Sequence, residues 1–282
     1  MNMTRLFDAH CHLFDVLLPD NIGAIVNATK PNDWDAVIRL SNEKPNVWGA
    51  IGVHPWYLAD LPNDWDVRLY DLLVQNPNIM VGEIGLDKHK PDMDKQIAVF
   101  VRQLEIAHNL SRGVHIHCVG AWDKVLHIKT GGRDDVNADG YRYPYEPTPY
   151  SVLERLAASG WIGKNDVVLD YGCGKGRVGF FLAYRAKAKT IGIEYDERIY
   201  ESALTNQKTT LSRIRPEFVL TRAEEYEVPE AVDRCYFFNP FSVEILQKVM
   251  ARILDSYYDH PREIFLFFYY PSDEYISYLM TV

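Results

Sequence analysis

Long hydrophobic runs are missing from this chain. The longest uninterrupted apolar stretch, from Ile264 to Tyr270, is far shorter than the ~20 residues that a membrane span needs. The N-terminus has no basic region leading into an apolar stretch, so we expect no signal peptide. Both absences argue against a membrane protein.

Cysteine is scarce, and positive charge is in deficit. The 4 cysteines in 282 residues make no disulfide framework, which predicts reduced thiols and a cytoplasmic location. The 30 Lys and Arg residues against 39 Asp and Glu residues give a formal net charge of −9. Such a charge excludes a non-specific grip on nucleic acid or anionic lipid, although it is compatible with a local basic pocket.

The composition is that of a globular protein, but it is unevenly distributed. Hydrophobic residues make up 47% of the chain and charged residues 24%, which is ordinary for a folded protein. Of the 9 histidines only His260 lies beyond residue 127, whereas tyrosine concentrates from Tyr141 onward. We therefore expect two domains, over residues 1–129 and 150–282. The linker between them, 130–149, is rich in Gly, Pro, Asp and Asn.

Strand-like runs alternate with helical patterns in both halves, which predicts α/β domains with parallel sheets. The expected strands are 6–12, 23–28, 47–53, 79–84, 114–118, 167–170, 190–194, 218–220, 235–238 and 264–270. The expected helices are 34–41, 66–73, 95–109, 151–158, 178–186, 198–207 and 243–258.

Metal-ligand chemistry gathers at strand ends in the first half. His10 and His12 are two residues apart on a strand, so both imidazoles project to the same side, as two ligands of one divalent ion do. Glu83, His117 and His54 end later strands, and sites of α/β folds lie at that edge. A carboxylate between imidazoles can bridge two Zn-like ions and lower the pKa of a bound water. The alternative for each histidine taken alone is a structural role.

These residues lie in the motifs FDAHCHL, GAIGVHPW, VGEIGLD and VHIHC, with the helix QLEIAH between the last two. Over residues 5–128 the chain resembles the TatD family of metal-dependent hydrolases and nucleases. The resemblance implies a (β/α)8 barrel with four metal ligands: His10, His12, Glu83 and His117.

The chain departs from that family in its length. Such a barrel needs about 250 residues, and the family's later metal-binding His and its closing Asp have no match in this sequence. We therefore expect an incomplete barrel with weak binding of a divalent metal (Zn, Mg or Mn) and absent or crippled hydrolysis.

The second half carries a glycine-rich turn between a strand and a helix. Gly172, Gly174 and Gly176 let the backbone turn tightly and approach a ligand closely. Asp170 can accept hydrogen bonds from a ligand amine. Glu194, at the end of the next strand, stands where a doubly wound fold places the acid that binds a ribose. The tight G-x-G-x-G spacing, with an acid two residues before it, favours S-adenosylmethionine over NAD.

VVLDYGCGKGR, IGIEYD and FFNPFS resemble the motifs of class I SAM-dependent methyltransferases, from about Tyr143 onward. The resemblance implies that the glycine turn and Asp170 cradle the cofactor, with Glu194 on its ribose. Tyr145 and Tyr150 lie where such enzymes close the pocket.

Asn239, Pro240 and Phe241 stand where N-methyltransferases carry an Asn/Asp-Pro-Pro-aromatic motif, which makes them candidates for binding a planar nitrogen acceptor. The alternative is a turn at a strand end. No general base is identifiable.

We therefore predict a partial TIM-type (β/α) barrel followed by a Rossmann-like parallel-sheet domain, with methyl transfer from SAM to an unknown acceptor, for which a nitrogen group is one candidate. One alternative is a metal-dependent phosphodiester hydrolase or deoxyribonuclease of TatD type, with nucleic acid reached only through the first half. The other is an inactive fusion of two truncated domains. Strand 264–270 is then an apolar exposed edge that favours self-association.

Overall fold

The computed structural model describes residues 6–12 and 21–281. The chain divides into two compact units, Met1–Ala121 and Trp122–Val282. Residue 129, where the sequence placed the end of the first domain, and the whole segment 130–149 fall in the second unit. Among the described residues, no helix has the length and apolar character required to cross a membrane.

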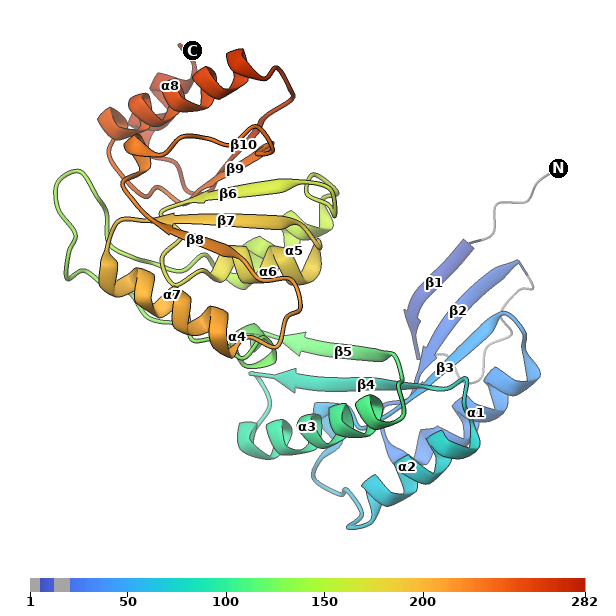
Figure 1. Cartoon of the computed structure of the whole chain (residues 1–282). Coiled ribbons are helices and arrows are strands. Elements are labelled where there is room, and N and C mark those ends of the chain that lie inside the picture. Colours follow the sequence, from blue (N-terminus) through green and yellow to red (C-terminus); the bar gives the residue numbers. More distant parts are fainter. Residues whose placement is uncertain (1–5, 13–20, 282) are drawn as a thin grey trace. The chain divides into compact units, whose positions relative to one another are not determined.

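The first unit is a parallel five-stranded sheet in the order β1-β2-β3-β4-β5, curled into a half-barrel. Its strands are β1 (Leu6–Cys11), β2 (Ile22–Asn27), β3 (Val47–Ile51), β4 (Met80–Asp87) and β5 (Val114–Val119). Its helices α1 (Trp34–Glu43), α2 (Trp65–Gln75) and α3 (Met93–Asn109) lie on one face of the sheet (Figure 1).

Helix α3 fixes the loops that leave two strands of this sheet. Its apolar residues Val99, Phe100 and Ile106 are buried, as an amphipathic pattern predicts. Two glutamines are buried on the same helix. Gln103 bonds both the N–H (2.7 Å) and the C=O (3.2 Å) of Val53, just after β3. Gln96 likewise accepts from the N–H of Asp87, the last residue of β4, at 2.8 Å and donates to its C=O at 3.1 Å. These bonds satisfy backbone groups at the strand ends where the candidate ligands lie.

The second unit is a parallel five-stranded sheet in the order β10-β9-β6-β7-β8. Its strands are β6 (Val167–Tyr171), β7 (Lys189–Glu194), β8 (Glu217–Leu220), β9 (Arg234–Phe237) and β10 (Phe265–Phe268). Its helices are α4 (Trp122–Val125), α5 (Tyr150–Ala158), α6 (Arg177–Arg185), α7 (Glu197–Thr209), α8 (Val243–Asp259) and α9 (Asp273–Leu279) (Figure 1).

The strand order reverses beside β6, because β7 follows it on one side and β9 lies on the other. In open α/β sheets, ligands bind in the crevice outside the carboxyl ends of the strands at this switch point. Stacked aromatic rings hold the strands together there. Phe237 packs on Tyr171 at 4.8 Å and on Phe268 at 4.6 Å between ring centroids. The predicted α/β class and Rossmann-like sheet are confirmed.

Segment 130–149 forms no helix and packs against the rest of the second unit. Backbone bridges join Asp134 to Tyr145 and Arg142 to Phe241, and the N–H of Tyr143 donates to the C=O of Pro240 at 3.1 Å. Its Gly, Pro and Asp residues keep it irregular, while these bonds hold it in one path. We call residues 130–149 the strap.

Strand β10 differs from the prediction in length. It ends at Phe268 rather than Tyr270, because Tyr270 has a φ of 53°, which no strand residue adopts. Among the described strands β10 pairs with β9 alone, so it lies at the sheet edge as expected, but all four of its side chains are partly buried. The short helices α4 and α9 were not predicted.

Candidate functional site

The first unit brings two strand ends together around one carboxylate. His10 and His12 come from β1 and its end, and Glu83 comes from β4. The Nε2 atoms of the two histidines lie 3.3 and 3.2 Å from Glu83 Oε2 and 3.2 Å from each other. The histidine side chains are half exposed, whereas Glu83 is buried. Three ligand atoms therefore converge at an accessible position.

The same carboxylate faces a second set of groups. Its Oε1 lies 3.2 Å from His117 Nδ1, and its Oε2 lies 3.8 Å from His54 Nε2. The other nitrogen of His117 lies 3.4 Å from Asp87 Oδ2, which orients the ring as carboxylates commonly orient metal-bound histidines. The four predicted ligands are thus close together. Glu83 belongs to two groups that could each hold a metal ion, one with His10 and His12 and the other with His54 and His117. Imidazole and carboxylate donors of this kind fit Zn²⁺ and similar ions.

The ionisation of this cluster follows from burial and from its mixed charges. Burial opposes the charged form of Glu83, but the hydrogen bond from His117 and electrostatic interactions with His54 and His10 hold its pKa below the usual range. Burial, and after it the neighbouring His117, lower the pKa of His54 to about 4. Burial also lowers the pKa of His117, yet bonds to Glu83 and Asp87 leave it above its ordinary value.

Hydrogen-bond partners decide which histidine nitrogens are free to bind a metal. His12 Nδ1 lies 2.9 Å from the C=O of Asn27, which can only accept, so Nδ1 carries the proton and Nε2 is free. His54 is different. Its Nδ1 accepts from the N–H of Trp56 at 3.2 Å, so the neutral ring is protonated on Nε2, which lies 3.8 Å from Glu83 Oε2, beyond hydrogen-bond distance. In this tautomer neither nitrogen of His54 is free to bind an ion.

In the second unit, the strand β6 runs into the predicted glycine turn. Gly172, Gly174 and Gly176 have φ values of 72°, 57° and 88°, a region that disfavours other residues. A Cβ on Gly174 would lie 2.0 Å from the ring of Tyr145, and one on Gly172 would lie 2.6 Å from Pro240. The turn is therefore packed tightly between the strap and the loop after β9.

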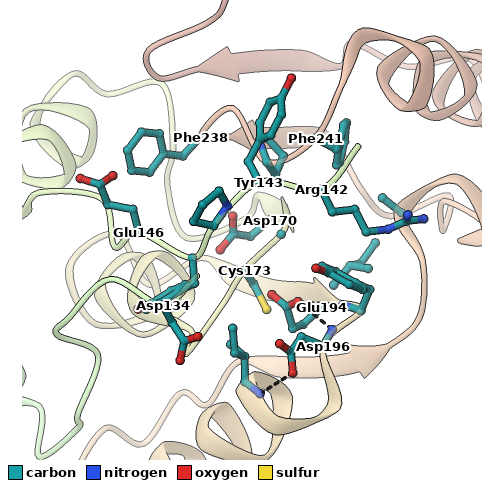
Figure 2. Close-up of a pocket in the computed structure, with 18 of the residues that line it drawn as sticks. Asp134, Arg142, Tyr143, Glu146, Asp170, Cys173, Glu194, Asp196, Phe238 and Phe241 are labelled. Atoms are coloured by element: carbon teal, nitrogen blue, oxygen red, sulfur yellow. Dashed lines mark hydrogen bonds between the residues drawn. The ribbon is translucent and has the colours of Figure 1, made fainter. Parts of the chain in front are cut away.

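A pocket opens beside this turn, with Asp170 and Glu194 at its centre (Figure 2). Glu194 accepts from the N–H groups of Gly174 (2.9 Å), Tyr195 (2.9 Å) and Asp196 (3.0 Å). Asp170 Oδ2 is buried with no hydrogen-bond partner among the described residues. Burial, and then the charge of Glu194, raise the pKa of Asp170 to about 8. The pocket thus contains a buried carboxyl group, that of Asp170, with one oxygen that lacks a hydrogen-bond partner among the described residues.

The strap covers this pocket. Arg142 donates to Glu224 Oε1 at 2.6 Å and lies over the ring of Tyr195, and Asn137 donates to Asp196 at 2.8 Å. Glu224 Oε2 is buried and has no partner in the part of the chain that the structure describes. Sequence reasoning missed Arg142 and Asn137, because an irregular segment gives no indication of what it will cover. Asp196 could have been found as the acid that caps α7.

The predicted pocket residues divide into two groups. Asp170, Gly172, Glu194, Pro240 and Phe241 line the pocket. Gly174, Gly176 and Tyr150 are not among the lining residues. The hydroxyl of Tyr150 donates to Asp123, and Tyr145 lines the pocket beside the glycine turn.

Asn239 adjoins the pocket wall without lining it. Its φ is 40°, and its Oδ1 is buried without a partner among the described residues. Tyr236, which bonds Thr148 of the strap at 3.1 Å, is a lining residue that the sequence did not indicate.

Comparison with known proteins assigns each half separately. A family model described as TatD related DNase matches residues 7–169, and one described as Methyltransferase domain matches residues 168–260. The 3'-5' ssDNA/RNA exonuclease TatD of Escherichia fergusonii is 26% identical over 133 residues, covering 41% of this chain and 51% of that protein. The putative deoxyribonuclease tatdn3 of Danio rerio is 33% identical over 143 residues, covering 41% and 54%. The chain spans about half the length of these relatives.

Among solved structures, an RNA methyltransferase from Salinibacter ruber in complex with S-adenosyl-L-homocysteine covers 39% of this chain and 71% of its own, at 23% identity and a TM-score of 0.36. The family models make the chain a fusion of a TatD-like region and a methyltransferase-like region.

Proposed function

Because the chain belongs to the TatD related DNase family and carries a methyltransferase domain after that region, we propose that its second unit binds S-adenosylmethionine and transfers the methyl group to a nitrogen acceptor. The observation that carries the proposal is the unpartnered Oδ2 of Asp170. A buried carboxylate without a partner costs free energy, and a cationic ligand removes that cost. SAM carries an ammonium and a sulfonium.

The residues around the pocket supply complementary groups for the rest of such a ligand. Glu194 uses three of its roughly four acceptor positions on backbone N–H groups, which leaves one for a ribose hydroxyl. The buried Oε2 of Glu224 is an acceptor for the amino group of an adenine. Arg142 holds Glu224 in place from the strap.

The acceptor side lies at the loop after β9. Pro240 and Phe241 line the pocket, and Phe238 packs on Tyr269 at 4.7 Å between centroids. The unpartnered Oδ1 of Asn239 lies beside them and can accept an N–H from a planar amine. SAM when bound supplies an activated methyl group, so the protein contributes by positioning the acceptor and excluding water.

Titration calorimetry with S-adenosylhomocysteine tests the proposal. We expect micromolar binding to the chain, loss of binding in Asp170→Ala, and no change in the control Asp71→Asn, an exposed acid of the first unit. A folded chain that does not bind the ligand contradicts the proposal. We place this activity in the cytoplasm, as the low cysteine content suggests.

A second candidate function is metal-dependent phosphodiester hydrolysis by the first unit. The observation that favours it is the position of Glu83 between His10 and His12 on one side and His117 on the other. A divalent ion there would supply an activated water. The protein would hold it through His10, His12, Glu83 and His117, with Asp87 orienting His117. Nucleic acid is the substrate that the family membership suggests for this unit alone.

A further inference from the structure

Asn27, the last residue of β2, contacts both histidines of the β1 motif. Its main-chain carbonyl accepts from His12 Nδ1 at 2.9 Å. Its side-chain Nδ2 lies 3.2 Å from His10 Nδ1. Asn27 itself is fully buried, whereas the two histidine side chains are half exposed.

The side-chain amide of Asn27 is only half satisfied. Its Nδ2 also lies 3.4 Å from the C=O of Ile25, whereas its Oδ1 has no donor within reach among the described residues. Gly82 leaves room for that oxygen, since a Cβ there would lie 3.1 Å from it. A buried amide oxygen without a donor is rare in folded proteins and calls for a functional reason.

The contact with His10 sets which of its nitrogens carries the proton. A nitrogen that faces an N–H donor is an acceptor, so neutral His10 is protonated on Nε2. That nitrogen lies 3.2 Å from the acceptor Nε2 of His12 and 3.3 Å from Glu83 Oε2. A metal at Nε2 requires the other tautomer, with the proton on Nδ1. A half-turn of the Asn27 amide brings its Oδ1 opposite His10 Nδ1, where the oxygen can accept the proton on that nitrogen.

We propose that Asn27 is the positioning residue of the metal site. Its carbonyl holds His12 in the ligating tautomer at all times. Its amide turns to hold His10 in that tautomer when an ion binds. The inference rests on the metal site proposed for the first unit. An amide suits both states because it carries a donor and an acceptor, whereas a carboxylate serves only the metal-bound state and an alkyl group serves neither.

Nitrogen NMR of the ¹⁵N-histidine-labelled chain, at about pH 8 where ordinary histidines are neutral, tests the inference. Without metal we expect His12 protonated on Nδ1 and His10 on Nε2. Added Zn²⁺ should convert His10 to the Nδ1-protonated form. In Asn27→Asp, His10 should be protonated on Nδ1 before any metal is added.

Zinc titration calorimetry gives the second readout. We expect Asn27→Leu to bind Zn²⁺ about 10- to 100-fold more weakly, as loss of an orienting partner typically does. Asn27→Asp should retain the wild-type affinity within about threefold, well short of that loss. The control Asn63→Leu changes an exposed loop residue and should bind normally. Thermal unfolding shows whether each variant is folded, and Asn27→Asp provides the test if the leucine variant is not.

The outcomes separate this inference from the function on which it rests. If the wild-type histidines have the stated tautomers but do not respond to Zn²⁺, the metal site is wrong and the role of Asn27 falls with it. If Zn²⁺ binds and its affinity is the same in Asn27→Leu, only the role of Asn27 is overturned. A wild-type His10 already protonated on Nδ1 without metal also overturns it.

Discussion

Asp170 and Glu194 lie at the carboxyl ends of neighbouring parallel strands as two buried carboxylates, and among the described residues only Glu194 receives backbone N–H groups. Each burial opposes ionisation, so the pKa of both acids lies above its ordinary value. Because Oδ2 of Asp170 lacks a donor, the proton resides on Asp170 near neutral pH. Near neutral pH the pocket therefore holds a protonated carboxyl group beside the hydrogen-bonded Glu194.

The pH dependence of unfolding should report Asp170. A pKa of about 8 in the folded chain, against an ordinary 3.8, means that the folded state binds the extra proton between these values. Stability is therefore lost as pH rises from about 4 through 8. Between about pH 7 and 9 the ionisation of this group should lower the free energy of unfolding by about 1.4 kcal/mol. Urea unfolding of wild type and Asp170→Asn measures it. Equal pH slopes in the two proteins would contradict the prediction.

Binding of S-adenosylhomocysteine should release a proton. Asp170 is mostly protonated at about pH 7 and must ionise to pair with the ligand ammonium. We expect the calorimetric enthalpy to vary with the ionisation enthalpy of the buffer, giving close to one proton released. Asp170→Asn should show no such dependence, and a wild-type enthalpy independent of buffer would argue against a neutral Asp170.

Glu224 should distinguish adenine from hypoxanthine. If its buried Oε2 accepts from the adenine amino group, Glu224→Gln should bind S-adenosylhomocysteine about tenfold more weakly and lose its preference over S-inosylhomocysteine. Glu225→Gln is the matched control, because that neighbour is exposed. Competition binding of the two ligands measures the preference. A preference that survives in Glu224→Gln would place the adenine elsewhere.

Gly174→Ala should disturb the strap. The new Cβ would meet the ring of Tyr145 at 2.0 Å, and the φ of 57° disfavours alanine. We expect a loss of about 1–3 kcal/mol in stability together with weaker cofactor binding. Gly140→Ala, which meets nothing within 4 Å, should leave both nearly unchanged. Thermal unfolding compares them, and equal effects of the two substitutions would refute the packing argument.

Glu83→Gln should abolish the metal chemistry of the first unit. The carboxylate faces four histidines, and a neutral amide can neither bridge two ions nor balance their charge. We expect Zn²⁺ affinity to fall at least about tenfold and metal-dependent cleavage of a simple phosphodiester to disappear. Glu105→Gln on the exposed face of α3 is the control. Wild-type zinc affinity in Glu83→Gln would rule out this carboxylate as a ligand.

Local patterns were sufficient to predict the elements that position both sites. The apolar strands and the glycine turn were read from the sequence because their signals lie within a few residues. The position of the strap could not be predicted from the sequence. Its irregular composition is compatible both with a free loop and with a segment bonded to Phe241 and Pro240.

Distant contacts also decided which individual residues matter. The sequence gives no means of distinguishing Tyr145 from Tyr150 as a residue that closes the pocket. In the structure α5 begins at Tyr150, and the hydroxyl of Tyr150 donates to Asp123. Asn27 resembled an ordinary residue at a strand end until β1 was placed beside it.

The two buried glutamines of α3 make that helix a spacer of fixed length. Gln96 and Gln103 are seven residues apart, so they face the same direction after two turns and reach the ends of two different strands. One inserted or deleted residue between them would rotate one amide by about 100° away from its strand. Substitutions on the outer face of α3 are therefore compatible with the ligand cluster, whereas a change in the number of residues between the glutamines is not.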